Sequence, residues 1–360
     1  MRICFISLGT FTHIGAYLDY FRQGGHEVIF LSLSPSPERG VPTCNVGLGT
    51  KYSETAGKWK YPISMIRARR LLKRLQPDIV HAHYATSAGL TALVCGFHPT
   101  VVTVHGSDLT LGIKSRIWRP LLRRIFQHAD CVNVVSEDLA KMVLSLGTET
   151  KKVETLTLGI DTNTFSFVER QAPDPSRGVR LVCTRRLEPV FDHQTIINAL
   201  GLLKEEGITF DMTIVGDGSM RDTLKQQVHT MGLDGRVSFS GRVPNDALPE
   251  ILRRHDVYLS ASLWDGTSLS LLEAMAMGLF PIVSDIKANA AWLHHNADGL
   301  LHKVGDARDL ANCVMQLCSN PALAVDAAGG NREKVVCLAS RKANMKRLEQ
   351  IYEKLINQRR

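Results

Sequence analysis

Two acidic residues with seven positions between them carry the strongest chemical signal in the sequence. Asp265 lies in a polar turn, and Glu273 lies about one turn into a predicted helix, within WDGTSLSLLEAMAMG. The start of that helix exposes unpaired backbone amides, which can bind a phosphate group. These amides belong to Gly266, Thr267, Ser268 and Leu269. Glu273 could then accept hydrogen bonds from ribose hydroxyls, and Asp265 from sugar hydroxyls. The alternative is an ordinary packed helix with one acid at its N-cap and one on its surface.

The elements that would position these residues form two similar series. Short β-rich apolar runs alternate with stretches of helical period, first from RICFISL to CVNVVS and then from VRLVCT to FPIVSD. Such alternation predicts βαβ units and parallel sheets. Helices are expected near residues 14–23, 194–205, 220–231, 246–254, 269–277 and 341–356.

A polar turn segment, LGIDTNTFSF, separates the two series. A chain of 360 residues also exceeds the size of one hydrophobic core, so two domains are expected. We predict an α/β protein with two doubly wound, Rossmann-like domains, residues 1–165 and 166–340, that face a central cleft. Residues 341–360 are expected to form a closing helix. In such sheets, ligands bind beyond the carboxyl ends of the strands.

Positive charge is concentrated in one region of the first half. The net charge is +8, and residues 51–124 alone hold thirteen Lys or Arg and three acids. Met65, Ala68, Leu72 and Leu75 make an apolar stripe on a predicted helix beside a basic stripe. The clusters Lys58–Arg74 and Lys114–Arg124 could lie on an anionic membrane surface or collect an acidic acceptor; the alternative is a solvated face. No nucleic-acid recognition motif accompanies them.

The N-terminus and the cysteines bear on the compartment. The N-terminal residues lack the pattern of a signal peptide, and no apolar run is long enough to span a membrane. The eight cysteines are scattered without CxxC spacing, which favours reduced thiols. We therefore expect a cytoplasmic protein, with membrane association open. No DxD-like acidic pair or Cys/His spacing indicates a metal, so no cofactor is expected.

Several blocks together resemble the retaining glycosyltransferases of family four, which have the GT-B fold. The stretch from Asp265 to Gly278 is similar to that family's motif of two acids separated by seven residues, with Asp265 in place of the usual Glu. FDMTIVGDGSMRDTL and VSFSGRVPNDALPEIL are similar to its strand, glycine turn and following segment. The resemblance implies that Gly216 and Gly218 line the donor side, and that Arg242 and Val243 lie against the nucleotide base.

The block CTRRLEPVFDHQTIINAL resembles the phosphate-binding turn of the same family. Arg186 stands on the family's arginine, whose guanidinium fork can bind two phosphate oxygens. The family's lysine falls on Phe191 and its glycine on Asp192, so one phosphate cation is replaced. Arg185 or His193 could substitute for it; for Arg185 the alternative is a surface charge.

In the first half, the resemblance is looser. LGTFTHIGAY, DIVHAHY and TVVTVHGSDL are similar to the family's first turn and to two later strand ends. We expect His105 to lie closest to the transferred sugar, and Asp108 to orient it or to contact the acceptor. His83 and His81 could instead satisfy groups near the core. The acceptor-side set is Gly9, Thr10, His13, His83 and Asp108.

The resemblance implies a retaining hexosyltransferase. It would move a sugar from a nucleotide diphosphate sugar, with uridine diphosphate as the family's commonest carrier, to a hydroxyl of a glycan or lipid-linked acceptor. Such a reaction belongs to polysaccharide or glycolipid synthesis. Two alternatives stay open: a sugar-nucleotide epimerase or phosphorylase of the same fold, and a non-catalytic protein that binds sugar nucleotides or polyanions.

Overall fold

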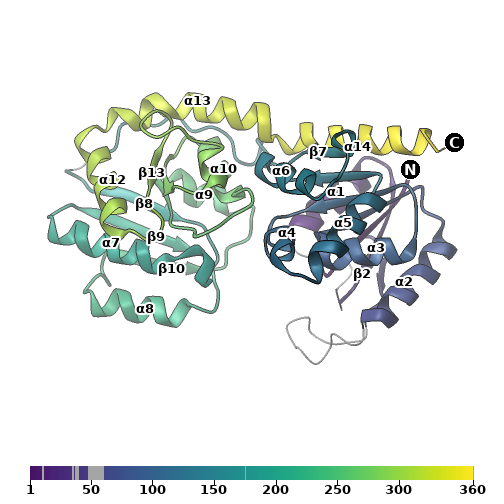
Figure 1. Ribbon diagram of the computed structural model, residues 1–360. Helices are drawn as coiled ribbons and strands as arrows, with labels where there is room; N and C mark the ends of the chain where they lie inside the picture. The colour runs from purple at the N-terminus through teal and green to yellow at the C-terminus, as the bar shows by residue number, and fades with distance from the viewer. Residues whose placement is uncertain (10–11, 35, 37–39, 48–60, 175, 360) are drawn as a thin grey trace. The chain divides into compact units, whose positions relative to one another are not determined.

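The computed structural model describes residues 1–9, 12–34, 36, 40–47, 61–174 and 176–359, with side chains for all of these except 12, 13 and 61. The described chain forms two compact units. The first unit holds residues 1–158 and 343–360, and the second holds residues 159–342. Each unit is an α/β layer structure with helices on both faces of a sheet (Figure 1). The predicted fold class, with two doubly wound α/β units, is confirmed.

The sheet of the first unit is parallel, with the strand order β3-β2-β1-β4-β5-β6-β7. Its strands are β1 (Arg2–Ser7), β2 (Glu27–Ser32), β3 (Thr43–Asn45), β4 (Ile79–His83), β5 (Thr100–Val104), β6 (Cys131–Val134) and β7 (Val153–Thr155). The central strands are buried along their whole length, because helices cover both faces. This explains why they are continuous apolar runs in the sequence.

The helices of the first unit make two layers. They are α1 (Thr12–Gln23), α2 (Tyr61–Leu75), α3 (Leu90–Cys95), α4 (Ser107–Thr110), α5 (Trp118–His128), α6 (Glu137–Ser145) and α14 (Arg341–Asn357), with a π-helix η2 (Tyr84–Gly89) and short 3-10 turns at Gly112–Lys114 and Thr150–Lys152. Residues of α2, α3, α5 and α6 share one core with the sheet. On the other face, Phe5 of β1 packs against Phe21 of α1, which stacks on Tyr352 of α14.

The sheet of the second unit is also parallel, with the order β10-β9-β8-β11-β12-β13. Its strands are β8 (Val179–Cys183), β9 (Phe210–Val215), β10 (Val237–Gly241), β11 (Val257–Ser260), β12 (Phe280–Ser284) and β13 (Leu300–His302). Its helices are α7 (His193–Glu205), α8 (Arg221–Thr230), α9 (Leu248–Arg253), α10 (Leu269–Ala276), α11 (Lys287–Ala290), α12 (Ala307–Ser319) and α13 (Ala322–Ala339), with a 3-10 turn at Pro189–Phe191.

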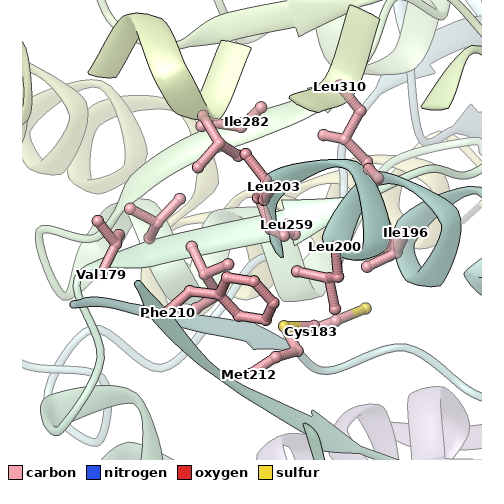
Figure 2. Close-up of a cluster of buried hydrophobic side chains, with 14 of the residues drawn as sticks. Val179, Cys183, Ile196, Leu200, Leu203, Phe210, Met212, Leu259, Ile282 and Leu310 are labelled. Atoms are coloured by element: carbon pink, nitrogen blue, oxygen red, sulfur yellow. The ribbon is translucent and has the colours of Figure 1, made fainter. Parts of the chain in front are cut away.

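Two cores enclose this second sheet. On one face, Val179, Phe210 and Leu259 from the strands meet Leu200 of α7 and Leu310 of α12 (Figure 2). On the other face, α9, α10 and the end of α13 pack against alternate strand residues. Helix α10 is therefore almost entirely buried, which fixes the loop that leads into it.

Both sheets reverse their strand order at one point, and in open α/β sheets ligands bind beyond the carboxyl ends of the strands at such a point. In the first unit this switch point lies between β1 and β4, and in the second between β8 and β11. The loops after β8 and β11 contain Arg185, Arg186 and the Asp265–Ser268 turn. The topology therefore brings the second unit's candidate residues to one edge of its sheet.

Candidate functional site

Arg185 is held in place from three sides in the loop after β8. Its guanidinium forms an ion pair with Asp265 and donates a 3.1 Å hydrogen bond from Nη1 to Ser268 Oγ. The guanidinium carbon also lies 4.1 Å from the ring centroid of Phe191, a cation–π contact. The Arg185 and Asp265 side chains are only 10% and 16% exposed. Arg185 is thus a built-in part of the loop, and Asp265 compensates its charge.

Arg186 is in a different state from its neighbour. It is exposed, and its guanidinium carbon lies 5.9 Å from the Phe191 ring centroid. Within the described parts of the chain, Arg186 takes part in no ion pair and no side-chain hydrogen bond. Phe191 therefore lies near both arginines, and Arg186 is the one whose charge is available to a ligand.

Asp192 stands where the family's phosphate-binding turn has glycine, and it adopts a glycine-like backbone conformation. Its φ is +42°, in the left-handed region that favours glycine. Its carboxylate accepts a 2.6 Å hydrogen bond from Thr195 Oγ1 and caps helix α7. The cap offsets the backbone strain. His193, the other candidate substitute for the lysine, is buried, and its pKa is lowered to about 4, mainly by burial. It does not supply a positive charge near neutral pH.

Gly216 and Gly218 lie against the backbone of the arginine loop. A Cβ at Gly216 would lie 2.4 Å from the carbonyl oxygen of Arg185, and one at Gly218 would lie 2.4 Å from that of Leu187. Gly216 also has φ +152° and donates a 2.9 Å hydrogen bond to the carbonyl of Gly241. Both positions need glycine for close approach.

The loop after β10 contains Arg242 and Val243, which the resemblance places against the nucleotide base. Arg242 follows Gly241 and is exposed, whereas Val243 is half-buried and packs against the core beside α9 and α10. The structure thus brings these two residues next to the Gly216 turn, as the hydrogen bond between Gly216 and Gly241 shows.

The start of α10 has some of its amides already occupied. Ser268 is the N-cap, and its Oγ accepts a 3.2 Å hydrogen bond from the Leu271 amide. Gly266 donates its amide to Asp265 Oδ1 at 2.8 Å. The Gly266 amide was predicted to bind phosphate, but in the structure it is already bonded to the Asp265 carboxylate.

Glu273 lies on α10, with its side chain buried and the residue only 7% exposed. Burial raises its pKa to about 7, against the opposing effect of the Arg341 and Arg185 charges. Near neutral pH, Glu273 can therefore accept hydrogen bonds as a carboxylate or donate one as an acid. A surface acid, the alternative from sequence, is excluded by its burial.

In the first unit, His83 and His105 meet at the ends of β4 and β5. His83 Nδ1 lies 3.1 Å from His105 Nε2, and the two rings stack with centroids 5.3 Å apart. His105 also stacks on Tyr84 at 4.4 Å. Of these three residues, Tyr84 was not foreseen. A single aromatic residue after a strand end carries no sequence signal of its own.

Asp108 orients the backbone around His105. It is 7% exposed and accepts hydrogen bonds from the amides of Ala85 at 2.7 Å and Gly106 at 2.8 Å. Burial raises its pKa, although these backbone donors act in the opposite direction. Asp108 therefore joins the loops after β4 and β5.

The other histidine and the first turn have simpler placements. His81 is fully buried, bonds to Thr103 Oγ1 at 2.6 Å and to the Tyr352 hydroxyl, and has a pKa lowered to about 3 by burial. It is a core histidine. Gly9 is buried after β1. Thr10 lies outside the described residues, and His13 is described only by its backbone in α1.

The family match agrees with this geometry. Residues 167–347 match the family described as glycosyl transferases group 1, and residues 9–164 match glycosyltransferase family 4. The first match covers half of the chain and contains the whole site of the second unit. The chain belongs to the glycosyl transferases group 1.

Relatives of this group 1 glycosyltransferase include one named for amylovoran biosynthesis and one named for a diphosphoundecaprenol-linked substrate. The amylovoran biosynthesis glycosyltransferase AmsK of Erwinia amylovora is 25% identical over 71% of this chain and 64% of that protein. The UDP-Gal:alpha-D-GlcNAc-diphosphoundecaprenol alpha-1,3-galactosyltransferase of Escherichia coli is 26% identical over 72% and 71%. Among solved structures, Anabaena HepE in complex with UDP and glucose shares the fold, with TM-score 0.79, 16% identity and coverage of 99% and 100%.

Two further observations concern the described part of this glycosyltransferase. None of its helices is both long and apolar enough to cross a bilayer. No three metal-ligating side chains gather within it.

Proposed function

We propose that this glycosyltransferase is a retaining enzyme that moves a sugar from a nucleoside diphosphate to a hydroxyl acceptor. The observation that carries the proposal is the switch point of the second sheet, where Arg186, the start of α10 and buried Glu273 come together. We assign donor binding to the second unit and acceptor binding to the first. A guanidinium fork and helix amides suit a diphosphate, and a buried carboxyl suits ribose hydroxyls.

The donor carrier we propose is uridine diphosphate. The name of the Escherichia coli relative specifies a UDP-linked galactose, and the HepE complex contains UDP. The acceptor we propose is a glycan or lipid-linked sugar, because one relative serves amylovoran biosynthesis and the other is named for an undecaprenol-linked substrate. The eight free thiols fit an enzyme of the reducing cytoplasm.

The proposed reaction breaks the bond from the anomeric carbon to the phosphate oxygen and forms one to the acceptor oxygen on the same face. The electron pair of the broken bond goes to the diphosphate, and the acceptor proton leaves with it. Arg186 and the amides of Thr267 and Ser268 would stabilise that developing charge without a metal. His105 would lie beside the transferred sugar, oriented through Asp108. Asp265 would contact sugar hydroxyls while it keeps its bond to Arg185.

The first experiment is a thermal-shift panel of UDP, GDP, ADP and their sugars, followed by transfer assays with Arg186→Ala and Glu273→Ala. A ligand that binds only the folded protein raises its melting temperature. We expect selective stabilisation by one nucleotide sugar and loss of transfer in both variants, whereas Arg308→Ala, an exposed arginine on α12, retains it. Full transfer by both site variants would contradict the assignment. Reaction without an acceptor would indicate an epimerase, and binding without turnover a non-catalytic protein.

We also propose that the basic face of the first unit rests on an anionic membrane. Ile63 and Ile66 of α2 are exposed beside Arg67 and Arg70, and α3 packs between α2 and α5. Ile117, just before α5, is 73% exposed beside Arg116. Isoleucines among arginines can enter the headgroup region of anionic lipids. Lys58 to Lys60 of the predicted cluster lie outside the described residues.

Sedimentation with vesicles tests this surface. We expect binding to phosphatidylglycerol vesicles that weakens with salt, and loss of binding in Ile63→Ser/Ile66→Ser. If that variant bound the vesicles as well as the wild type, α2 would not be part of the membrane contact. A matched control is Val325→Ser, which changes an exposed apolar residue on α13 of the second unit.

A further inference from the structure

Tyr84 adopts a backbone conformation that its side chain disfavours. Its φ is +73°, in the left-handed region where Cβ crowds the neighbouring carbonyl oxygen. It also begins η2, a π-helix, which is a rare form that often occurs at functional sites. Backbone strain of this kind persists only where the surrounding structure enforces it. The structure around Tyr84 must therefore contain what holds it there.

The backbone just after Tyr84 is tied to the loop of His105. One carboxylate, that of Asp108, accepts hydrogen bonds from Ala85, which follows Tyr84, and from Gly106, which follows His105. The bonds measure 2.7 and 2.8 Å, and Asp108 is buried. This clamp sets the separation of the two loops and leaves Tyr84 and His105 facing each other.

The result of that arrangement is an aromatic stack on His105. The Tyr84 and His105 ring centroids are 4.4 Å apart with planes 30° from parallel, and His105 also contacts His83 Nδ1 through its Nε2 at 3.1 Å. The rings of His83 and Tyr84 both stack on His105, with centroids 5.3 and 4.4 Å away. Tyr84, the nearer of the two rings, therefore helps to hold the ring plane of His105.

Simple core packing does not account for the strain. Tyr84 and His105 are both only half-buried, so the contact removes little apolar surface from water compared with a core aromatic residue. We propose that Tyr84 is a positioning residue that fixes the ring plane of His105. Its use in sugar transfer rests on the proposed function, whereas the positioning itself does not.

The placement can be tested without any assay of transfer, by nuclear magnetic resonance of protein with ¹³C-labelled histidine. His105 is assigned by the loss of its signals in His105→Gln. Protons over the face of a stacked ring are shifted upfield, so Tyr84→Asn is expected to move the His105 ring signals downfield. Asparagine tolerates a positive φ but has no aromatic ring. Tyr84→Phe keeps the ring and is expected to leave those signals in place.

Kinetics then tests what the positioning does. We expect Tyr84→Asn to lower kcat on the order of 10- to 100-fold, as misplacement of a reacting group does, with KM for the donor nearly unchanged. Its melting temperature should match or exceed that of the wild type, because strain is relieved. Tyr84→Phe should retain kcat.

Either of two results would overturn the proposal: His105 signals that do not move in Tyr84→Asn, or a kcat in that variant equal to the wild-type value. A fall in kcat explained by a lower melting temperature, and equally present in Tyr84→Phe, would also overturn it. If the wild type transfers no sugar from any donor, the proposed function fails, and the resonance comparison alone decides the placement.

Discussion

Asp265 and Arg185 form an ion pair across the switch point of the second sheet, so the acid after β11 is bound to the arginine after β8. The two acids of the motif therefore differ in state. Asp265 has a compensated charge, whereas Glu273 is buried with its pKa raised. The pair also distinguishes the adjacent arginines, since Arg185 is paired within the loop, whereas Arg186 is exposed and forms no ion pair among the described residues.

Asp265→Asn removes the counter-ion of a mostly buried guanidinium. We expect the free energy of unfolding to fall by roughly 3 kcal/mol, because an unpaired charge would remain in a site where both side chains are less than a fifth exposed. Urea unfolding measures this change. Glu250→Gln is the matched control, since its ion pair with Arg254 is exposed and should contribute less than about 0.5 kcal/mol. Equal effects of the two substitutions would contradict a structural role for the Asp265 pair.

Phe191→Leu tests the aromatic ring that replaces the family's lysine. The substitution keeps an apolar side chain but removes the face on which Arg185 lies, so we expect a loss of about 1 kcal/mol of stability. Donor binding should weaken as the Arg185 loop loosens. Phe191→Tyr retains the face and serves as the control. If Phe191→Leu had the same free energy of unfolding and the same UDP affinity as Phe191→Tyr, the cation–π contact would contribute to neither.

Gly218→Ala places a methyl group 2.4 Å from the Leu187 carbonyl oxygen. Backbone atoms cannot yield as a side chain does, so we expect a destabilisation of about 1–3 kcal/mol and weaker nucleotide binding. Gly235→Ala is the control, because a Cβ there meets no atom within 4 Å. Melting temperatures of the two variants, with and without UDP, provide the measurement. Similar values for both would mean that the two loops separate freely.

The alternation of strands and helices was predictable, because buried parallel strands must be continuous apolar runs and amphipathic helices must keep their period. The predicted helix at residues 194–205 matches α7. Of the predicted apolar stripe, Met65, Ala68 and Leu72 are buried and Leu75 is half-buried. Helix α13 was not foreseen, since Gly329 and Gly330 lie in its middle and its residues show almost no apolar stripe.

The site was predictable only as far as loops and spacing define it. The motif of Asp265 and Glu273 indicated the loop and the helix, and Arg186 was identified from the resemblance. Spacing could not show that Arg185 rather than a ligand engages Asp265, nor that burial raises the pKa of Glu273. These properties depend on which side chains meet across β8 and β11, and on the layer of helices that covers α10.

Glu273→Gln tests the effect of burial on Glu273 through the pH dependence of stability. The pKa of Glu273 rises from 4.5 to about 7 on folding, so between these values the folded protein holds a proton that the unfolded chain has lost. Stability contributed by the protonated acid is therefore present below pH 4.5 and declines as the pH rises to about 7. A neutral glutamine lacks this decline. We expect the variant to exceed the wild type in unfolding free energy by up to about 3 kcal/mol at pH 8, and the difference to shrink toward zero near pH 4.5.

Urea unfolding at pH 5, 6, 7 and 8 measures this difference. Glu250→Gln, on the exposed face of α9, is the control and should show little change with pH. A difference between Glu273→Gln and the wild type that stays constant from pH 5 to 8 would show that Glu273 ionises as an ordinary exposed acid does.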